Sequence, residues 1–341
     1  MNVRRRPFGL PDVLVPTGSE SADFDRHAID GLGVPQPVLM ENAGRSAATL
    51  VHRMHPRGEV LAVVGAGNNG GDALVALRTL AAWGRPVRAV LVADREPGEL
   101  LHGWTLPVVR DGDLDDEGWA ALLGGASVVV DGILGTGISG APRERQARAI
   151  GRVNGSGRPV VALDVPSGAD ADTGATPGAV IDADATICFG HPKLGCLLHP
   201  ARARVGRLLA VEIGFPPHDP ERVPFTGRLV TPGWVTARRP ARRLDTHKNE
   251  VGAVLVVAGR PGMAGAAVLA ARAALRGGAG LVRVSSPEAN RTVLQSAAPE
   301  AIFVDAGDPA ALGAAVEASR AVVVGPGLGT DPAAATRVRT V

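Results

Sequence analysis

Short apolar runs alternate with longer amphipathic segments along most of the chain. The first set of runs is rich in Val, Ile, Leu and Ala and covers residues 60–64, 87–93, 127–130, 160–163, 185–189 and 208–213. Continuous apolar runs of this length are typical of parallel strands, because crossover helices cover both faces of a parallel sheet. The pattern predicts an α/β fold with a mostly parallel sheet and helices on both faces.

Helical periodicity appears between and before these runs. Apolar residues recur at helical spacing over residues 74–81, and residues 23–30 and 41–52 also have helical patterns. Residues 1–20 have no pattern, and we expect them to be a loose lead-in.

The same alternation begins again after a proline-rich segment. Six prolines lie between residues 214 and 243, beside a cluster of arginines, which predicts a linker. Beyond it, residues 252–258, 281–285 and 321–324 are predicted strands, and few residues follow the last of them. We therefore expect two domains, residues 1–225 and 226–341, of which the second is incomplete.

Composition narrows the class of protein. The 341 residues are 45% hydrophobic and 21% charged, and the formal net charge is only +2 with scattered arginines, so we expect no nucleic-acid partner. No run approaches the roughly 18–20 apolar residues of a membrane helix, and no apolar segment follows the basic Arg4–Arg6, so we expect no membrane contact, no signal peptide and a cytoplasmic location. The sequence has no tyrosine, which argues against tyrosine acid–base chemistry, and Cys188 and Cys196 cannot form a zinc site alone.

The loop from Gly65 to Asp72 lies between a predicted strand and a predicted helix. Such a turn offers unpaired N–H groups to an anion. Three of its glycines fit the G-x-G-x-x-G spacing, and Asp94 ends the next predicted strand where a ribose-binding acid would lie, so an NAD-dependent oxidoreductase stays open. Against it, the Asp72 carboxylate would repel a pyrophosphate, and Asn68 and Asn69 bring amide groups that a phosphate loop does not need.

Four polar residues follow predicted strands and can therefore meet at one edge of the sheet. They are Asn69, Asp131, Asp164 and Ser167. Amide, carboxylate and hydroxyl oxygens suit an alkali or alkaline-earth cation rather than zinc. Aspartates are also common caps and turn formers, so spacing alone leaves both interpretations open. Asp164 is the better candidate for a general acid or base.

Four motifs in this order carry a family resemblance. Leu39–Gly44, Gly67–Asp72, Asp131–Gly137 and Asp164–Gly168 closely resemble the YjeF N-terminal family, the NAD(P)H-hydrate epimerases, and the match covers about residues 20–216. Phe189 and Lys193 look like a later part of that pattern. The chain has Gly132 where the family often has Ala, and Ala73 where it often has Gly.

The resemblance implies a Rossmann-like sheet and an isomerase that interconverts the R and S forms of NADHX and NADPHX. Asp164 would contact the substrate and transfer the proton, and Asn69, Asp131 and Ser167 would bind a potassium ion. The implied substrate-binding residues are Asn68, Asn69, Gly70, Gly71, Asp72, Gly135, Thr136, Gly137, Ile138, Ser139, Gly140, Ala141 and Asp164.

The later part of the chain resembles the ADP-dependent NAD(P)H-hydrate dehydratases, which are lyases with a ribokinase-like fold. Residues 245–248, 259–266, 273–282 and 325–329 carry this resemblance, and Ala266 and Gly327 would contact the substrate. The family's later His-Pro-Gly-Glu and Gly-Ser-Gly-Asp segments have no counterpart here. We therefore expect an incomplete ribokinase-like domain without dehydratase activity, although a complete one would use ADP or ATP and Mg²⁺.

The expectation is a bifunctional family of nicotinamide nucleotide repair, acting on a small-molecule substrate. An incomplete sheet leaves an unpaired strand edge, so a homo-oligomer is possible. An NAD-dependent oxidoreductase and a non-catalytic nucleotide-binding protein are the alternatives.

Overall fold

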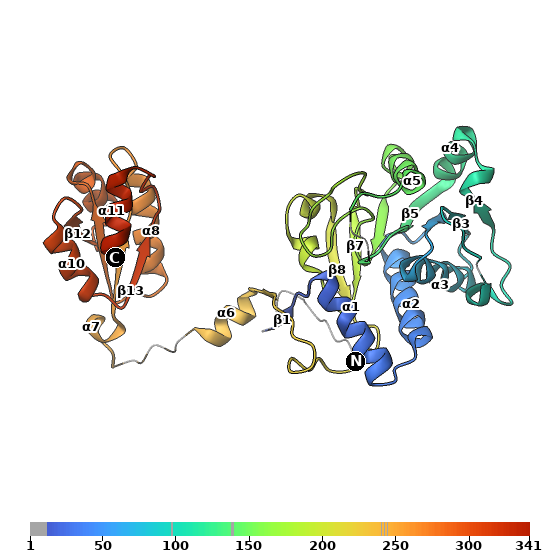
Figure 1. The fold of residues 1–341 in the computed structure, drawn as a ribbon, viewed down its shortest axis with the longest axis horizontal. Coiled ribbons are helices and arrows are strands. Elements are labelled where there is room, and N and C mark those ends of the chain that lie inside the picture. The colour runs from blue at the N-terminus through green and yellow to red at the C-terminus, as the bar shows by residue number, and fades with distance from the viewer. Residues whose placement is uncertain (1–11, 97, 138–139, 240, 242, 244) are drawn as a thin grey trace. The chain divides into compact units, whose positions relative to one another are not determined.

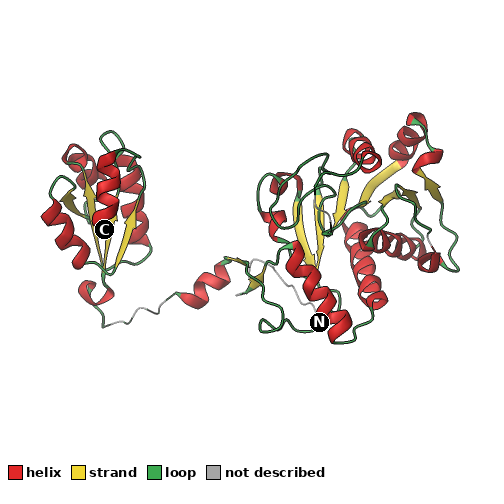
Figure 2. Ribbon diagram, viewed as in Figure 1, coloured by secondary structure: helices red, strands yellow, loops and turns green. Residues whose placement is uncertain are grey.

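A computed structural model describes residues 12–96, 98–137, 140–239, 241, 243 and 245–341 (Figure 1). The described chain forms two compact units that divide at residues 239 and 240. Each contains a parallel sheet covered by helices, which confirms the predicted α/β class (Figure 2). The domain boundary expected at 225 and 226 stays a prediction. Within these ranges no helix has both the length and the apolar character needed to cross a membrane.

The first unit contains a seven-stranded sheet in which every pair of neighbours is parallel. Its strand order reverses between β2 and β5, so the carboxyl ends of these two strands form the switch point at which doubly wound folds bind ligands. In spatial order the strands are β4 (Val108–Arg110), β3 (Val87–Leu91), β2 (Glu59–Val64), β5 (Ala126–Gly132), β6 (Val160–Leu163), β7 (Ala185–Phe189) and β8 (Arg207–Val211).

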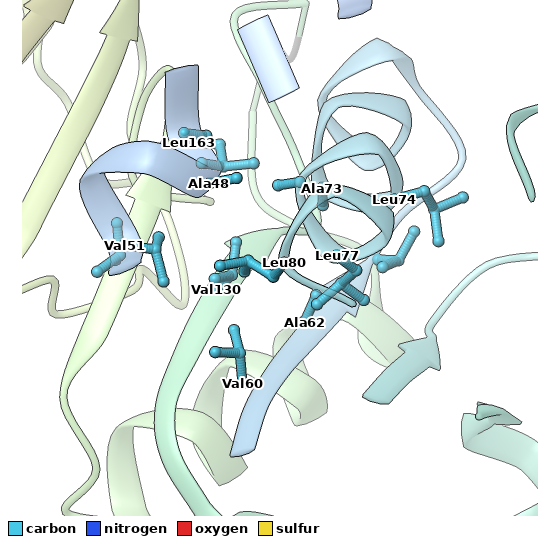
Figure 3. Close-up of a cluster of buried hydrophobic side chains, with 14 of the residues drawn as sticks. Ala48, Val51, Val60, Ala62, Ala73, Leu74, Leu77, Leu80, Val130 and Leu163 are labelled. Carbon is cyan, nitrogen blue, oxygen red and sulfur yellow. The ribbon is translucent and has the colours of Figure 1, made fainter. Parts of the chain in front are cut away.

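Helices cover both faces of this sheet because side chains alternate along each buried strand. Val60 and Ala62 of β2 pack toward α2 (Gln36–Met54) and α3 (Asn68–Ala82), where Leu77 and Leu80 complete the cluster (Figure 3). Their neighbour Leu61 packs on the other face, against residues of α4 (Asp116–Gly125) and α5 (Glu144–Gly155). Short helices η3 (Gly98–Leu101), η4 (Asp111–Asp113), η5 (Leu194–Leu197) and η6 (Ala201–Arg204) lie in the connections.

The N-terminal segment is ordered earlier than expected. Helix α1 (Gly18–Arg26) begins after Thr17, whose side chain accepts a hydrogen bond from Glu20 N, and it continues as a π-helix, η2 (His27–Gly31). Strand β1 (Val13–Leu14) pairs with β9 (Arg228–Leu229). The expectation of a loose lead-in is therefore wrong for residues 12–20, because a capping box starts the helix there.

The proline-rich segment is also not a free linker over most of its length. Phe215 and Phe225 lie with ring centroids 5.0 and 5.5 Å from that of Phe24 on α1, and His218 stacks on Phe225 at 4.1 Å. These aromatic contacts and the pairing of β9 with β1 hold the segment on the first unit. Helix α6 (Pro232–Arg238) follows, and the units divide after residue 239.

The second unit has a four-stranded parallel sheet. Helices α8 (Ala264–Arg276) and α9 (Arg291–Ala297) cover one face, and α10 (Pro309–Glu317) and α11 (Pro332–Thr340) cover the other. In spatial order the strands are β12 (Ile302–Asp305), β11 (Leu281–Ser286), β10 (Ala253–Val257) and β13 (Ala321–Val324), and the short helices are α7 (Lys248–Val251) and η7 (Glu288–Asn290).

Candidate functional site

Asp131 and Ser167 meet at the carboxyl end of β5. Ser167 Oγ donates to Asp131 Oδ1 at 2.5 Å, and Ser167 N donates to Asp131 Oδ2 at 2.9 Å. Both side chains are fully buried. Burial raises the pKa of Asp131 to about 6, although the hydrogen bonds from Ser167 and from Ile133 N oppose this shift. A buried carboxyl of this kind gains from a nearby cation.

Asn69, in the first turn of α3, reaches the same place. Its Nδ2 donates to the carbonyl oxygens of Leu134 at 2.7 Å and Leu163 at 3.0 Å, so the amide joins the ends of β5 and β6. Its Oδ1 is buried and accepts no hydrogen bond from a described residue. Because an unpaired buried acceptor is costly, this oxygen marks a position for a ligand.

The three predicted cation ligands are therefore close to one another. Amide, carboxylate and hydroxyl oxygens form a hard donor set that fits K⁺, and the free Asn69 Oδ1 is the observation that supports the fit. Within the described part of the chain, no group of three or more His, Cys, Asp or Glu side chains lies close enough together to hold a metal ion.

Asp164 follows β6 in an unusual backbone conformation. Among the non-glycine residues that the structure describes, it alone has a φ in the left-handed region, at 62°. Its Oδ1 accepts hydrogen bonds from Phe189 N at 3.1 Å and from Lys193 Nζ, and its N donates to Ile187 O at 2.8 Å. The side chain keeps 15% exposure, so the carboxylate is held in place yet accessible. Strain of this kind is common at functional sites.

Lys193 is the cationic partner of Asp164 and is almost completely buried. Its Nζ also donates to Phe189 O at 2.9 Å. Burial is the largest single influence on the pKa of Lys193 and lowers it, but the charge and hydrogen bond of Asp164 together with other neighbouring acidic groups outweigh burial, so the net pKa is raised.

Two further carboxyl groups interact with this ion pair. Burial raises the pKa of Asp72 well above its usual range, and the charges of Asp164 and Asp25 add to the rise. Burial raises the pKa of Asp25 to about 6, where the charge of Lys193 opposes the rise and the charge of Asp164 adds to it. With its pKa raised, Asp72 gives up its proton less readily than a free aspartate.

Asp25 is a site residue that the sequence did not indicate. It lies on α1, outside the motifs of the first unit, and only its charge interactions with Asp164, Asp72 and Lys193 place it here. The Thr17-x-x-Glu20 capping box would have predicted α1, but no local signal connects Asp25 with the sheet edge.

The glycine loop requires its glycines for close packing. A Cβ added at Gly70 would lie 2.2 Å from the carbonyl oxygen of Gly65, and one at Gly71 would lie 2.7 Å from the sulfur of Met40. The exposed Asn68 Oδ1 accepts a 3.3 Å hydrogen bond from Gln36 Nε2.

The second predicted substrate loop lies beside Asn69 at its start. A Cβ added at Gly135 would lie 3.2 Å from that of Asn69. Further along, Ala141 lies against Gly178, and Gly140 has a φ of 88°. Thr136 and Gly137 complete its described part, whereas Ile138 and Ser139 lie outside the described residues.

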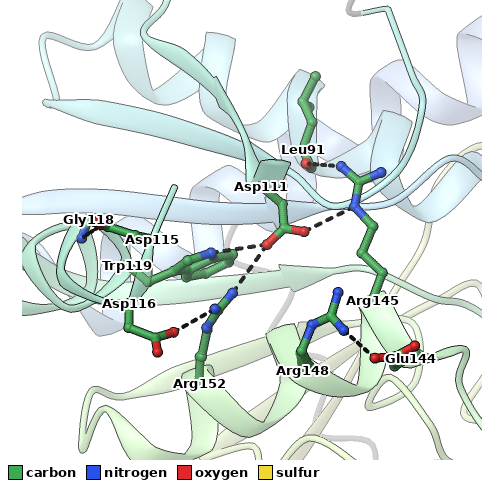
Figure 4. Close-up of polar contacts among 10 residues, drawn as sticks. All are labelled: Leu91, Asp111, Asp115, Asp116, Gly118, Trp119, Glu144, Arg145, Arg148 and Arg152. Atoms are coloured by element: carbon green, nitrogen blue, oxygen red, sulfur yellow. Dashed lines mark hydrogen bonds and ion pairs between the residues drawn. The ribbon is translucent and has the colours of Figure 1, made fainter. Parts of the chain in front are cut away.

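A buried polar network anchors the helix that follows this loop. Asp111 accepts hydrogen bonds from Trp119 Nε1 at 3.0 Å, Arg145 Nε at 3.0 Å and Arg152 Nη1 at 3.3 Å (Figure 4). Arg145 also pairs with the fully exposed Asp94 at 3.1 Å. The network connects α5 with η4 and α4. It also keeps Asp94, the ribose-binding acid expected under the oxidoreductase alternative, turned toward Arg145.

Ala73 and Gly132 are complementary in size. A Cβ added at Gly132 would lie 2.6 Å from Ala73 Cβ, which is too close for two methyl groups. The two departures from the family pattern therefore face each other, and the chain carries one methyl group between α3 and β5.

In the second unit, Ala266 and Gly327 are also neighbours. A Cβ added at Gly327, whose φ is 65°, would lie 2.7 Å from Ala266 Cβ. The loop after β13 thus lies against the start of α8, at the carboxyl ends of the central strands.

The strand order, with polar residues at its switch point, defines a doubly wound α/β protein. Residues 36–195 match the family described as YjeF-related protein N-terminus, and residues 254–341 match NAD(P)H-hydrate dehydratase. The chain belongs to the YjeF-related family whose N-terminal domain is followed by a dehydratase domain, and the predicted resemblance is confirmed.

Relatives and a solved structure agree with this assignment. A bifunctional NAD(P)H-hydrate repair enzyme Nnr from Moorella thermoacetica is 36% identical over 96% of this chain and 66% of its own length. The protein of the same name from Escherichia coli is 35% identical over 96% of this chain and 63% of its own length. The chain thus spans just under two thirds of these relatives. The crystal structure of yeast YNL200c is 25% identical, with a TM-score of 0.52 over 60% of this chain and 90% of that one.

Proposed function

We propose that the N-terminal domain, expected at residues 1–225, is an NAD(P)H-hydrate epimerase that interconverts the R and S forms of NADHX and NADPHX. One observation carries the proposal: an accessible carboxylate, Asp164, paired with the buried Lys193, lies at the same sheet edge as the hard-oxygen cluster of Asn69, Asp131 and Ser167. The names of the relatives and the matched family support the substrate class.

Asp164 is the proposed catalytic residue. Epimerisation requires that the hydroxyl at the hydrated ring carbon leaves and returns on the other face, or that the ring opens and closes. Either route needs a group that gives and takes back one proton, and the carboxyl of Asp164 is accessible for this task. Lys193 would hold the carboxylate in position.

Asn69, Asp131 and Ser167 are the proposed ligands of a potassium ion. A bound cation would supply positive charge beside the glycine loop and offset the charge of a pyrophosphate. The substrate would lie along Asn68, Gly70, Gly71 and Asp72, and along residues 135–141, whose backbone N–H groups suit an anion.

For the second unit we propose that Ala266 and Gly327 would contact the substrate of the dehydratase reaction for which its family is named. ADP or ATP with Mg²⁺ would be the cofactors of that reaction. We place the protein in the cytoplasm with a small-molecule dinucleotide as its partner, and sedimentation of the purified chain tests whether it forms homo-oligomers.

The test of the epimerase is a chiral assay. One purified epimer of NADPHX is incubated with the protein, and the two epimers are separated by chromatography over time. Asp164→Asn should abolish the interconversion, whereas Asp94→Asn, at an exposed position, should leave it unchanged. Undiminished activity of Asp164→Asn would refute the catalytic role.

The potassium proposal needs a separate measurement. Activity is measured in KCl and in NaCl at equal ionic strength, for the wild type and for Asn69→Leu, which removes the unpaired amide oxygen. We expect the wild type to respond to potassium and the variant to lose that response. A variant that responds as strongly as the wild type would show that the cation binds elsewhere.

A further inference from the structure

Arg95 occupies the position where dinucleotide-binding folds recognise the adenosine ribose. In such folds the strand beside the glycine-loop strand ends in a residue that contacts the ribose 2′ position, an acid for a hydroxyl or an arginine for a phosphate. Here that strand is β3, which pairs with β2 and is followed closely by Asp94 and Arg95.

The two neighbours point to different partners. Asp94 is fully exposed and pairs with Arg145 on α5, so it does not face the glycine loop. The Arg95 guanidinium lies on the loop instead, because its Nη1 donates to the carbonyl oxygens of Gly65 at 3.3 Å, Ala66 at 3.0 Å and Gly67 at 2.7 Å.

These contacts also hold the guanidinium beside the next two glycines. A Cβ added at Gly70 would lie 3.1 Å from Arg95 Nη1, and one at Gly71 would lie 3.2 Å from Nη2. The three hydrogen bonds use Nη1 alone, and Nε and Nη2 donate to no residue that the structure describes. Arg95 therefore presents spare donors and a positive charge on a fixed fork, the geometry that suits a phosphate.

A second observation marks the same loop as a ligand site. On the opposite side of the loop, toward β6, the buried Asn69 Oδ1 has no partner among the described residues. The start of α3 thus has an unmatched acceptor on one side and unmatched donors of Arg95 on the other.

We propose that Arg95 is a specificity-determining residue that binds a 2′-phosphate, so that the site prefers 2′-phosphorylated dinucleotides, NADPHX over NADHX. This inference rests on the proposed function for its substrate, but it makes a claim about binding that can be measured without turnover. Asp94 is turned away toward Arg145, so it does not compete with a phosphate for Arg95.

The experiment is calorimetric titration of the full chain with 2′,5′-ADP and with 5′-AMP, which differ only in the 2′-phosphate, and with NADP⁺ and NAD⁺. The wild type should bind 2′,5′-ADP and NADP⁺ more tightly than their counterparts. Arg95→Gln should weaken the 2′-phosphorylated ligands about tenfold to hundredfold, and change 5′-AMP and NAD⁺ less than about twofold. Arg95→Lys keeps the charge and should retain part of the preference, and Asp94→Ala is the matched control that should change none of these affinities.

Two results would overturn the inference. A wild type without preference for the 2′-phosphate would refute it, and so would equal losses for both ligand classes in Arg95→Gln, which would show that Arg95 only shapes the loop. The outcome is separate from that of the epimerase assay. If the chain prefers 2′,5′-ADP but does not interconvert the hydrates, the proposed function alone is refuted. If the chain epimerises both hydrates equally and Arg95→Gln leaves the ligand affinities unchanged, this inference alone is refuted.

Discussion

The single methyl group between α3 and β5 gives a sharp test of the packing under the site. Gly132→Ala would place a Cβ 2.6 Å from Ala73 Cβ and 3.0 Å from the carbonyl oxygen of Asn69. Ala73 is fully buried, so neither backbone can move without disturbing the sheet or the first turn of α3. Ala73→Gly in the same chain would remove the opposing methyl group.

The magnitude follows from the contact distance. Two carbon atoms pack best at about 3.5–4.0 Å, so the new methyl group is about 1 Å too close. Overpacking of this kind costs about 1–3 kcal/mol. Ala73→Gly alone should cost about 1–2 kcal/mol through lower helix propensity and a lost buried methyl group. The double variant should be less destabilised than the sum of the two single variants by about 1–3 kcal/mol.

Tryptophan fluorescence during urea unfolding reports on the first unit alone, because all four tryptophans precede residue 240; they are Trp83, Trp104, Trp119 and Trp234. The control is Gly151→Ala on α5, where the added methyl group meets no atom within 4 Å. This control should be neutral or stabilise the unit by up to about 1 kcal/mol.

The reasoning fails if Gly132→Ala unfolds at the wild-type urea concentration. It also fails if the double variant shows the plain sum of the two single losses, because the methyl groups would then not be in contact.

Three further outcomes follow from the site. Lys193→Met leaves Asp164 without its buried partner and should lower the free energy of unfolding by about 3–5 kcal/mol in the same urea assay. Adding Asp164→Asn should restore part of this stability, and no recovery would show that the pair is not coupled. Gly65→Ala would bring a Cβ to 1.8 Å from the carbonyl oxygen of Ile133, so we expect little soluble protein, checked by expression yield, and a normal yield would contradict the packing. The pKa of Asp25 in the folded protein is about 6, above its usual 3.8, so the folded state binds a proton more tightly than the unfolded state. As pH rises from about 4 to 7, the free energy of unfolding of the wild type should fall by about 1–3 kcal/mol relative to that of Asp25→Asn, measured by urea unfolding at each pH. Parallel pH curves for the two proteins would contradict the burial of this carboxyl.

The sequence by itself predicted the layered α/β class and most of its strands. The expected strands at 160–163, 185–189 and 321–324 agree with β6, β7 and β13. The reason is local: a strand buried on both faces must be continuously apolar, and that requirement is written in consecutive residues. Strands β4 and β12 were missed, since both lie at sheet edges and are only partly buried.

The candidate site divides in the same way. Parallel strands bring their carboxyl ends to one edge, so the closeness of Asn69, Asp131 and Ser167 followed from where predicted strands end. The free amide oxygen of Asn69 could not be predicted, because it depends on which carbonyl groups the amide nitrogen meets.

Tertiary structure alone decided the electrostatics of the site. The pairing of Asp164 with Lys193, the approach of Asp25 from α1, and the turn of Arg95 onto the glycine loop all join residues of different elements. The proline-rich segment shows the same limit, since its aromatic contacts with α1 made it part of the first unit. Local pattern records which residues must be buried, but the direction of a charged side chain and the partner of an aromatic ring are set by packing between distant segments.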